Sequence, residues 1–221
     1  MAQQVAVIGM GRFGVSLARE LYRVGHDVLA VDSNAGLTQQ MMGQVTYSVT
    51  GDSTSEELLE EVGIRNFDTC VVAIGTDIQS SVLTTVLLKQ TFEIPHVVAR
   101  ATNVLHGKTL EAVGADRVVF PEQEMGLRTA HSLFQREVLE YMELTSGFGF
   151  SMVMATQGMI GKSIEHAGFG NARDKYGASV VAIRRGRDPI LSPSKDEVLQ
   201  EGDVLVIAAP EDALGNLGMG R

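Results

Sequence analysis

Three glycines near the start of the chain have the spacing of a phosphate-binding loop. Gly9, Gly11 and Gly14 stand in the arrangement G-x-G-x-x-G, between an apolar run at residues 5–8 and an amphipathic segment. The first glycine allows a tight turn, the second lets backbone approach a phosphate, and the third lets helix and strand pack closely. The first amides of the following helix also favour an anion. The sequence therefore predicts a phosphate loop made of Gly9, Met10, Gly11, Arg12, Phe13 and Gly14, rather than a turn that binds nothing.

An acidic residue follows the loop at the distance expected for a nucleotide site. Asp32 ends the apolar run at residues 28–31, where its carboxylate can accept hydrogen bonds from both ribose hydroxyls. Its negative charge would repel a 2′-phosphate, which argues against NADP. Ser33 and Asn34 are further candidates for contacts near the adenosine, and either can instead cap the next helix.

The segment Gly51-Asp52-Ser53-Thr54 follows the third expected strand. In the expected strand order, the carboxyl end of this strand lies on the adenine side of the nucleotide. Asp52 and Ser53 are therefore candidate ligand contacts. They can also cap the helix that begins there, with Glu56 three residues after Ser53, and the two roles can coexist.

Two further strand ends face the same region. Ala73, Ile74 and Gly75 end the fourth strand, across the expected crevice from the phosphate loop. Arg100 ends the fifth strand and is a candidate for the phosphate side, with a surface ion pair as the alternative.

Arg12 can meet a terminal phosphate bidentately, and a cation in the first turn of a helix is unfavourable unless an anion is nearby.

The elements that position these residues alternate regularly between strand and helix. This alternation indicates a Rossmann-like α/β fold, a doubly wound parallel sheet of order 3-2-1-4-5-6 covered on both faces. The expected strands are Val5–Ile8, Val28–Val31, Val45–Val49, Thr69–Ile74, His96–Arg100 and Arg117–Phe120. The expected helices are Arg12–Val24, Asn34–Met42, Ser53–Val62, Ile78–Thr91 and Val104–Val113.

The pattern changes after Pro121. Residues Glu122–Tyr141 are predicted to form one long crossover helix, and the glycine-rich stretch at residues 145–149 follows it. We therefore expect a nucleotide-binding domain at residues 1–143 and a small α+β domain at 144–221. The strands expected in the second domain are Ser151–Thr156, Ser179–Arg184 and Val204–Ala208.

Composition excludes several classes of protein. The chain has 221 residues, of which 44% are hydrophobic and 20% charged, as in ordinary globular proteins. Its 18 basic and 27 acidic residues give a net charge of −9, which argues against a nucleic-acid partner. Cys70 is the only cysteine and lies in an apolar run, so it is expected to be a buried hydrophobe in a reducing compartment. No apolar run approaches the ~20 residues of a membrane span.

Several segments together resemble the RCK family of potassium-conductance regulators. The loop GRFG, the segments GDST and FPE, and the later segments YGASVVAIRRG and LQEGDVLVIAAPED stand in the order of an RCK (TrkA-N) domain followed by a TrkA-C domain. The single N-terminal domain is similar to KtrA-type cytosolic subunits of bacterial potassium uptake systems, whereas TrkA carries two in tandem. The resemblance covers essentially the whole chain.

The resemblance implies a non-enzymatic regulatory subunit that senses ATP against ADP. It implies a homo-octameric ring, built from dimers, beneath a membrane-embedded potassium-translocating partner similar to KtrB or TrkH. The protein would be cytoplasmic and attached to the inner face of the membrane through this partner. The ligand only has to bind two ring shapes with different affinity to gate the partner.

Individual roles follow from the same resemblance. The arginine matching Arg12 senses the γ-phosphate, held by a neighbouring subunit. Glu122 matches a position associated with a divalent cation, Mg²⁺ or Ca²⁺, at the dimer interface, where symmetry-related copies and phosphate could supply further oxygens. Cyclic di-AMP can bind KtrA-like proteins between two C-terminal domains, in the region of Arg173, Tyr176, Ile183 and Pro193. For Ile183 and Pro193, packing at a dimer interface is the alternative.

The residues are also compatible with two other functions. One is a small NAD(H)-dependent oxidoreductase or NAD-sensing redox regulator, and the other is a regulator of a different cation channel. The enzyme hypothesis is disfavoured by the small second domain and by the lack of an evident catalytic base. His166 is interpreted as an exposed or capping residue.

Overall fold

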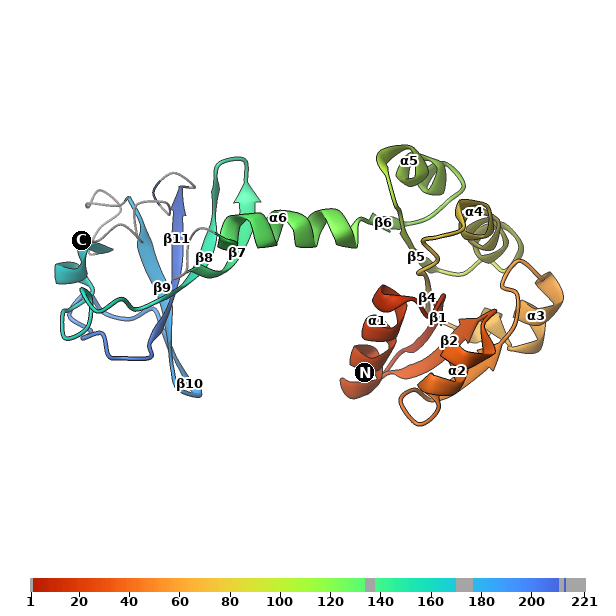
Figure 1. The fold of residues 1–221 in the computed structure, drawn as a ribbon, viewed down its shortest axis with the longest axis horizontal. Coiled ribbons are helices and arrows are strands. Elements are labelled where there is room, and N and C mark those ends of the chain that lie inside the picture. Colours follow the sequence, from red (N-terminus) through yellow and green to blue (C-terminus); the bar gives the residue numbers. More distant parts are fainter. Residues whose placement is uncertain (1, 134–137, 170–176, 211–212, 214–221) are drawn as a thin grey trace. The chain divides into compact units, whose positions relative to one another are not determined.

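The structure is a computed structural model that describes residues 2–133, 138–169, 177–210 and 213 (Figure 1). The chain divides into two compact units, residues 1–123 and 124–221. The expected domain boundary between residues 143 and 144 stays a prediction.

The described strands of the first unit form one parallel sheet of order β3-β2-β1-β4-β5-β6. This order confirms the predicted Rossmann-like topology. The strands are β1 (Gln4–Ile8), β2 (Asp27–Asp32), β3 (Tyr47–Thr50), β4 (Thr69–Val72), β5 (His96–Arg100) and β6 (Arg117–Val119). The helices are α1 (Arg12–Arg23), α2 (Ala35–Met41), α3 (Glu56–Glu61), α4 (Ile78–Val86) and α5 (Val104–Ala112), with the short helical turns η1 (Ile64–Asn66) and η2 (Leu87–Thr91).

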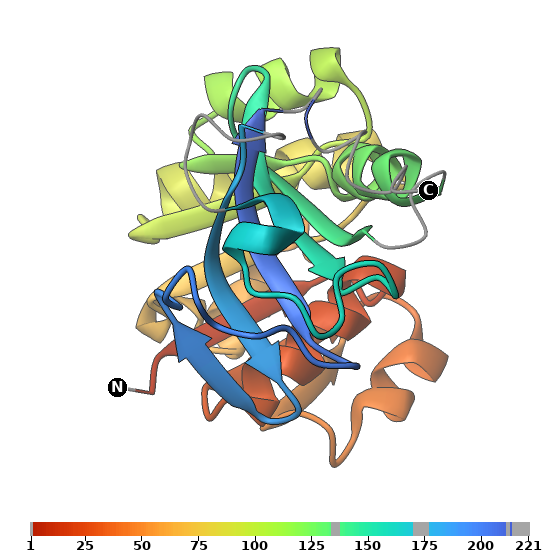
Figure 2. The same cartoon turned by 90° about the vertical axis from the view of Figure 1, so that its left-hand side faces the viewer.

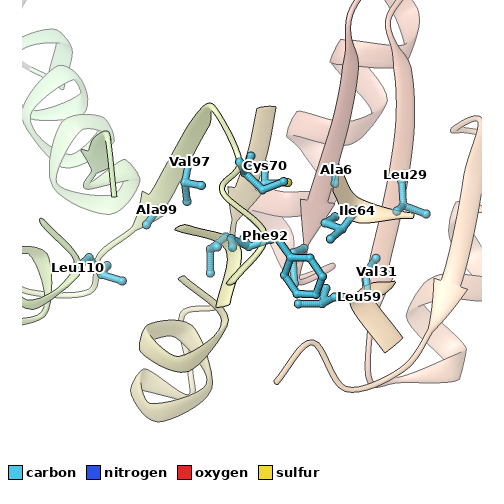
Figure 3. Packing of buried hydrophobic residues seen from close by; sticks show 14 of the residues in the cluster. Ala6, Leu29, Val31, Leu59, Ile64, Cys70, Phe92, Val97, Ala99 and Leu110 are labelled. Carbon is cyan, nitrogen blue, oxygen red and sulfur yellow. The ribbon is translucent and has the colours of Figure 1, made fainter. Parts of the chain in front are cut away.

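Alternate residues of the central strands pack on opposite faces of this sheet. Val5 and Val7 of β1 pack with Ala18 of α1, whereas Ala6 and Ile8 pack with the cluster beneath the later helices. Figure 3 shows that second cluster. Its labelled members are Ala6, Leu29, Val31, Leu59, Ile64, Cys70, Phe92, Val97, Ala99 and Leu110. Because the strands are buried on both faces, their sequences are continuously apolar.

Cys70 is fully buried in this cluster, as the sequence predicted. Burial raises the pKa of its thiol to about 12, so the group stays protonated at neutral pH. Cys70 is therefore a core residue.

The second unit is built on an antiparallel sheet of order β10-β9-β11-β8-β7, seen from another side in Figure 2. Its elements are β7 (Val138–Thr145), β8 (Phe148–Met154), the helical turn η3 (Glu165–Phe169), β9 (Ser179–Arg185), β10 (Asp188–Leu191) and β11 (Val204–Pro210). One apolar cluster, which includes Val153, Ile183, Leu205 and Ile207, holds the unit together. A small second domain that follows a Rossmann-like domain in the chain is thus confirmed.

The predicted long helix at Glu122–Tyr141 is wrong in its second half. Helix α6 (Pro121–Leu133) ends earlier, and β7 begins at Val138. The helical spacing continued through Val138, but residues of β7 pair with β8 in an antiparallel hairpin whose turn contains Gly147 at φ +77°. Pairing with a neighbouring strand overrides a weak local helical pattern.

No helix within the described residues is both long and apolar enough to span a bilayer.

Candidate functional site

A crevice of about 350 Å³ opens at the carboxyl ends of the first unit's strands. It lies at the switch point of the sheet, where β1 and β4 are neighbours but the chain turns in opposite directions, which is where α/β sheets bind ligands. Its volume falls in the range of small-molecule sites. The crevice is lined by Ile8, Gly9, Gly11, Val31, Asp32, Ser33, Asn34, Leu37, Gly51, Asp52, Ser53, Ala73, Ile74, Gly75, Thr76, Asp77, Ser80 and Arg100.

Gly9 and Gly14 have the structural roles that their spacing predicted, and the contact of Gly11 with a phosphate stays a prediction. Gly9 adopts φ +99°, a conformation that side chains disfavour. A Cβ on Gly14 would overlap the carbonyl oxygen of Gly9, so the close approach of α1 to β1 requires glycine there. A Cβ on Gly11 would meet nothing within 4 Å, and Gly11 lines the crevice. Space for a phosphate is thus left at Gly11.

The remaining loop residues do not line the crevice. Met10 is buried in the core, and Phe13 packs partly against that core. Arg12 is exposed at the start of α1. The loop therefore lines the crevice through Gly9 and Gly11, while the side chain of Arg12 is exposed to solvent.

The Asp32 carboxylate ties the loop to the end of β2. Its Oδ2 accepts a hydrogen bond from the Met10 amide at 2.6 Å, and its Oδ1 accepts from the Asn34 amide at 2.8 Å. Each oxygen keeps a lone pair for a further donor. Asp32 is therefore in place to receive a ribose hydroxyl.

Ser33 and Asn34 both reach the crevice. Asn34 caps α2, because its side chain accepts a hydrogen bond from the Gly36 amide at 2.8 Å. The capping role predicted for Ser33 or Asn34 thus belongs to Asn34. Ser33 is exposed at the crevice wall.

Asp52 is exposed at the crevice, and Ser53 is buried beside it. Asp52 accepts hydrogen bonds from the amide and the hydroxyl of Thr54, which lower the pKa of its carboxyl. The hydroxyls of Ser53 and Thr84 share a hydrogen bond of 2.8 Å. The predicted cap at Ser53 is wrong, since Ser55 caps α3 through the Leu58 amide. The register of the turn after β3 decides which serine meets the helix.

One acidic residue of the crevice was missed by sequence reasoning. Asp77 caps α4, where its carboxylate accepts hydrogen bonds from the amide and the hydroxyl of Ser80. These bonds lower the pKa of the Asp77 carboxyl. The negative charge of Asp77 partly opposes the lowering of the pKa of Asp52 by its bonds to Thr54. An aspartate directly before a helical segment was the available signal. The adjacent lining residues Thr76 and Ser80 were missed with it.

The fourth and fifth strand ends meet at the other side of the crevice. Ala73, Ile74 and Gly75 line it as predicted, and the guanidinium of Arg100 lies directly over Gly75, where a Cβ would overlap it. Arg100 Nη2 donates a hydrogen bond of 2.5 Å to Oε1 of Glu122, in the first turn of α6. The predicted ion pair is therefore present, and Arg100 also lines the crevice, while its contact with a phosphate stays a prediction.

Glu122 has no carboxylate neighbours that would complete a metal site among the described residues. Its partial burial raises the pKa, but the hydrogen bond from Arg100 and the positive charges of Arg100 and Arg12 lower it further. Glu122 is thus ionised at neutral pH and paired with a cationic side chain.

The candidates in the second unit do not form a site in the described structure. Ile183 is fully buried in the core, and Pro193 is partly buried. Arg173 and Tyr176 lie outside the described residues. His166 is exposed, as one of its two interpretations expected, and shares a hydrogen bond of 2.7 Å with the Ser163 hydroxyl. That hydroxyl also accepts from the His166 amide, so Ser163 is the capping residue of the pair.

Comparison with known proteins identifies the family. Residues 5–121 match the TrkA-N domain. The chain belongs to the TrkA-N family. Residues 152–217 match the TrkA-C domain, which confirms the order of domains expected from the motifs.

A full-length relative and two solved structures extend this result. The chain is 43% identical over 205 residues to Ktr system potassium uptake protein A of Bacillus subtilis (strain 168), a match that covers 93% of this chain and 90% of the relative. The crystal structure of the GsuK RCK domain matches 99% of this chain and 47% of its own, with a TM-score of 0.52 and 23% identity. GsuK bound to ADP matches 62% of this chain and 36% of its own, with a TM-score of 0.52 and 17% identity. The two structural matches show that the fold is shared.

Proposed function

We propose that this TrkA-N family chain is a nucleotide-sensing regulatory subunit that gates a membrane potassium transporter or channel, with ATP and ADP as its opposing ligands. One observation carries the proposal. Gly9 and Gly11 of the glycine loop, the carboxylate of Asp32 and the cationic Arg100 line one crevice, in a chain that is 43% identical to a potassium uptake protein. Its role needs no catalysis, since a ligand that binds two conformations unequally shifts their populations.

The position of Arg12 supports a sensor of phosphate number. Arg12 is exposed at the start of α1, and its side chain does not line the crevice of its own chain. A guanidinium in this place can reach the terminal phosphate held by a neighbouring subunit. ATP and ADP differ in that phosphate, so Arg12 would distinguish them.

Exposed apolar side chains support assembly with further copies. They lie on three helices of the chain, namely Ile78 and Leu83 on α4, Val104 and Leu105 on α5, and Met125 and Leu127 on α6. Exposed apolar clusters commonly mark interaction surfaces. We propose a homo-octameric ring built from dimers, attached in the cytoplasm to a KtrB- or TrkH-like potassium-translocating subunit of the membrane.

Two further ligands belong to the proposal. A divalent cation, Mg²⁺ or Ca²⁺, would use Glu122 together with phosphate oxygens and symmetry-related carboxylates at a dimer interface, because hard cations need several oxygen ligands. Cyclic di-AMP would bind between two C-terminal domains, near Arg173 and Tyr176.

NAD(H) is the alternative ligand, and Asp32 is the observation that favours it. A carboxylate at the end of β2 suits the ribose of NAD as well as that of ADP. A small NAD(H)-dependent oxidoreductase, or an NAD-sensing redox regulator, would use the same crevice.

A thermal-shift panel separates these ligands. The full chain is heated with ATP, ADP or NADH, each with and without Mg²⁺ or Ca²⁺. Strong stabilisation by ATP and ADP supports the proposal, because a ligand at 100 times its Kd stabilises a protein by about 2.7 kcal/mol. Stabilisation by NADH alone would overturn it.

A further inference from the structure

Arg100 has unused hydrogen-bonding capacity at the crevice. A guanidinium carries five N–H donors. Within the described residues, Arg100 donates one side-chain hydrogen bond, to Glu122, and its buried Nε has no acceptor. Buried donors are normally satisfied, and Arg100 lines the crevice, so its guanidinium has capacity for a further acceptor there. The guanidinium is held in place over Gly75 and is 18% exposed as a side chain.

Its partner Glu122 is held less firmly. The side chain of Glu122 is 65% exposed and lies in the first turn of α6. An exposed carboxylate keeps most of its hydration when its ion pair breaks, so little is lost by separation. The positive end of the helix dipole continues to favour a negative charge at this position. Of the two partners, Glu122 is therefore the one that can leave.

We propose that a phosphate group of the bound nucleotide displaces Glu122 from Arg100. This inference rests on the proposed function and adds the regulation of its site. With the crevice empty, Arg100 binds the carboxylate. With nucleotide present, the same guanidinium turns its forked N–H donors to phosphate oxygens, which it matches bidentately, and Glu122 is released.

The exchange connects the crevice to the exit of the chain from the first unit. Arg100 ends β5, Glu122 starts α6, and residues from Glu124 onward belong to the second unit. The ion pair ties the first turn of α6 to the strand end only while no phosphate competes. Nucleotide binding thus removes a tie at the start of the connecting helix. It also frees the Glu122 carboxylate for the proposed cation, so that cation binding follows nucleotide binding.

Competition makes a prediction with a definite sign. If Glu122 competes with phosphate, removing its charge strengthens nucleotide binding. If Glu122 instead assists the nucleotide directly, removing its charge weakens binding. A partly exposed pair supports a change of about threefold to fivefold.

The test is calorimetric titration of ADP into the full chain, in low salt with EDTA to exclude divalent cations. Glu122→Gln is expected to lower the Kd about threefold to fivefold. Glu124→Gln is the matched control, because it removes the same charge from an exposed position of the same helix, and it is expected to leave the Kd unchanged. Arg100→Gln is expected to raise the Kd about tenfold. In that background Glu122→Gln should have no further effect.

An unchanged or raised Kd in Glu122→Gln would overturn the exchange, as would the same gain in the Arg100→Gln background. If Arg100→Gln does not fold, as judged by circular dichroism, the uncharged Arg100→Met takes its place in the cycle. The wild-type titration distinguishes failure of the proposed function from failure of the exchange at Arg100. Wild type that binds no ADP or ATP overturns the proposed function together with the exchange, whereas normal wild-type binding without the Glu122 effect overturns the exchange alone.

Discussion

Two partly buried arginines, one in each unit, show how differently the units use charge. Arg185 in β9 donates to both oxygens of Asp203, to Glu197 and to the Val198 carbonyl, at 2.9–3.0 Å. Arg100 in β5 donates to the exposed Glu122 alone among the described residues and keeps a buried donor unpaired. The second unit satisfies its cation internally, whereas the first leaves capacity for an external anion. Arg185 is structural, and Arg100 is available to a ligand.

The acids of the two units differ in the same way. Asp203 is fully buried, accepts from Arg185 and receives the Gln200 amide at 2.9 Å. Asp52 and Asp77 line the open crevice and accept from neighbours within their own turns. Polar groups that stabilise a fold are paired and enclosed, whereas those that bind a ligand are positioned by local bonds and left accessible.

Removing Arg185 is expected to have the largest effect on stability. Arg185→Met leaves Asp203 buried without its cation, which typically costs about 3–5 kcal/mol. Urea unfolding followed by circular dichroism, with hydrogen exchange of the β9 and β11 amides, measures the loss in the second unit. The exposed neighbour Arg184→Met is the matched control. Arg100→Gln should cost about 1 kcal/mol or less. A large loss from Arg100→Gln, or none from Arg185→Met, would erase the contrast between the units.

The glycine loop separates stability from binding within the first unit. Gly14→Ala places a Cβ on the Gly9 carbonyl oxygen and is expected to cost about 2–3 kcal/mol in free energy of unfolding. Gly11→Ala has open space and φ −69°, so it should cost about 1 kcal/mol or less.

Gly11→Ala, the variant expected to lose little stability, is expected to lose nucleotide affinity. Gly11→Ala should still fold but lose ADP binding at least about tenfold, because its methyl group occupies the space left for phosphate. Calorimetry on the folded variant measures this. ADP binding at wild-type affinity would mean that the phosphates lie elsewhere.

The smallest expected effect is a difference between wild type and Arg185→Met in how the stability of the second unit depends on pH. The hydrogen bond from Arg185 lowers the pKa of Asp203 below its ordinary value of about 3.9. Ionised Asp203 therefore stabilises the second unit above that pH, and this stabilisation is lost as pH falls through the lowered pKa. In Arg185→Met, burial without a cation raises the pKa of Asp203, so the unit should instead gain stability on acidification. Urea midpoints between pH 3 and 6 report both signs. Parallel pH profiles would contradict the role of this pair.

The sequence predicts the first unit far better than the second. Its central strands are continuous apolar runs followed by glycine or capping residues, and the glycine fingerprint with Asp32 specifies the strand order. Strand β7 was mistaken for helix because its apolar residues continue the spacing of α6, and only its pairing with β8 distinguishes the two. The short edge strand β10 contains Pro189 and gives little signal.

Site residues were predictable where their place at the end of one strand decides their role. Contacts between side chains of two different elements were not. Gly9, Gly11, Asp32 and Arg100 were found from position alone. The pairing of Arg100 with Glu122 requires that β5 and β6 be neighbours with their carboxyl ends aligned. The predicted strand order contained that information. Which side chains bond there still depends on the turn into α6, and local sequence does not specify it.

The central claim is that the number of phosphates in the first unit's crevice controls potassium movement through a partner. Potassium flux into liposomes that contain the co-purified membrane subunit tests it most directly, with wild type or Arg12→Ala added under saturating ATP or ADP. The account predicts a flux with wild type that differs several-fold between ATP and ADP, and a difference that disappears in Arg12→Ala. Equal flux under both nucleotides with wild type would contradict the claim, and an undiminished difference in Arg12→Ala would contradict the role of Arg12.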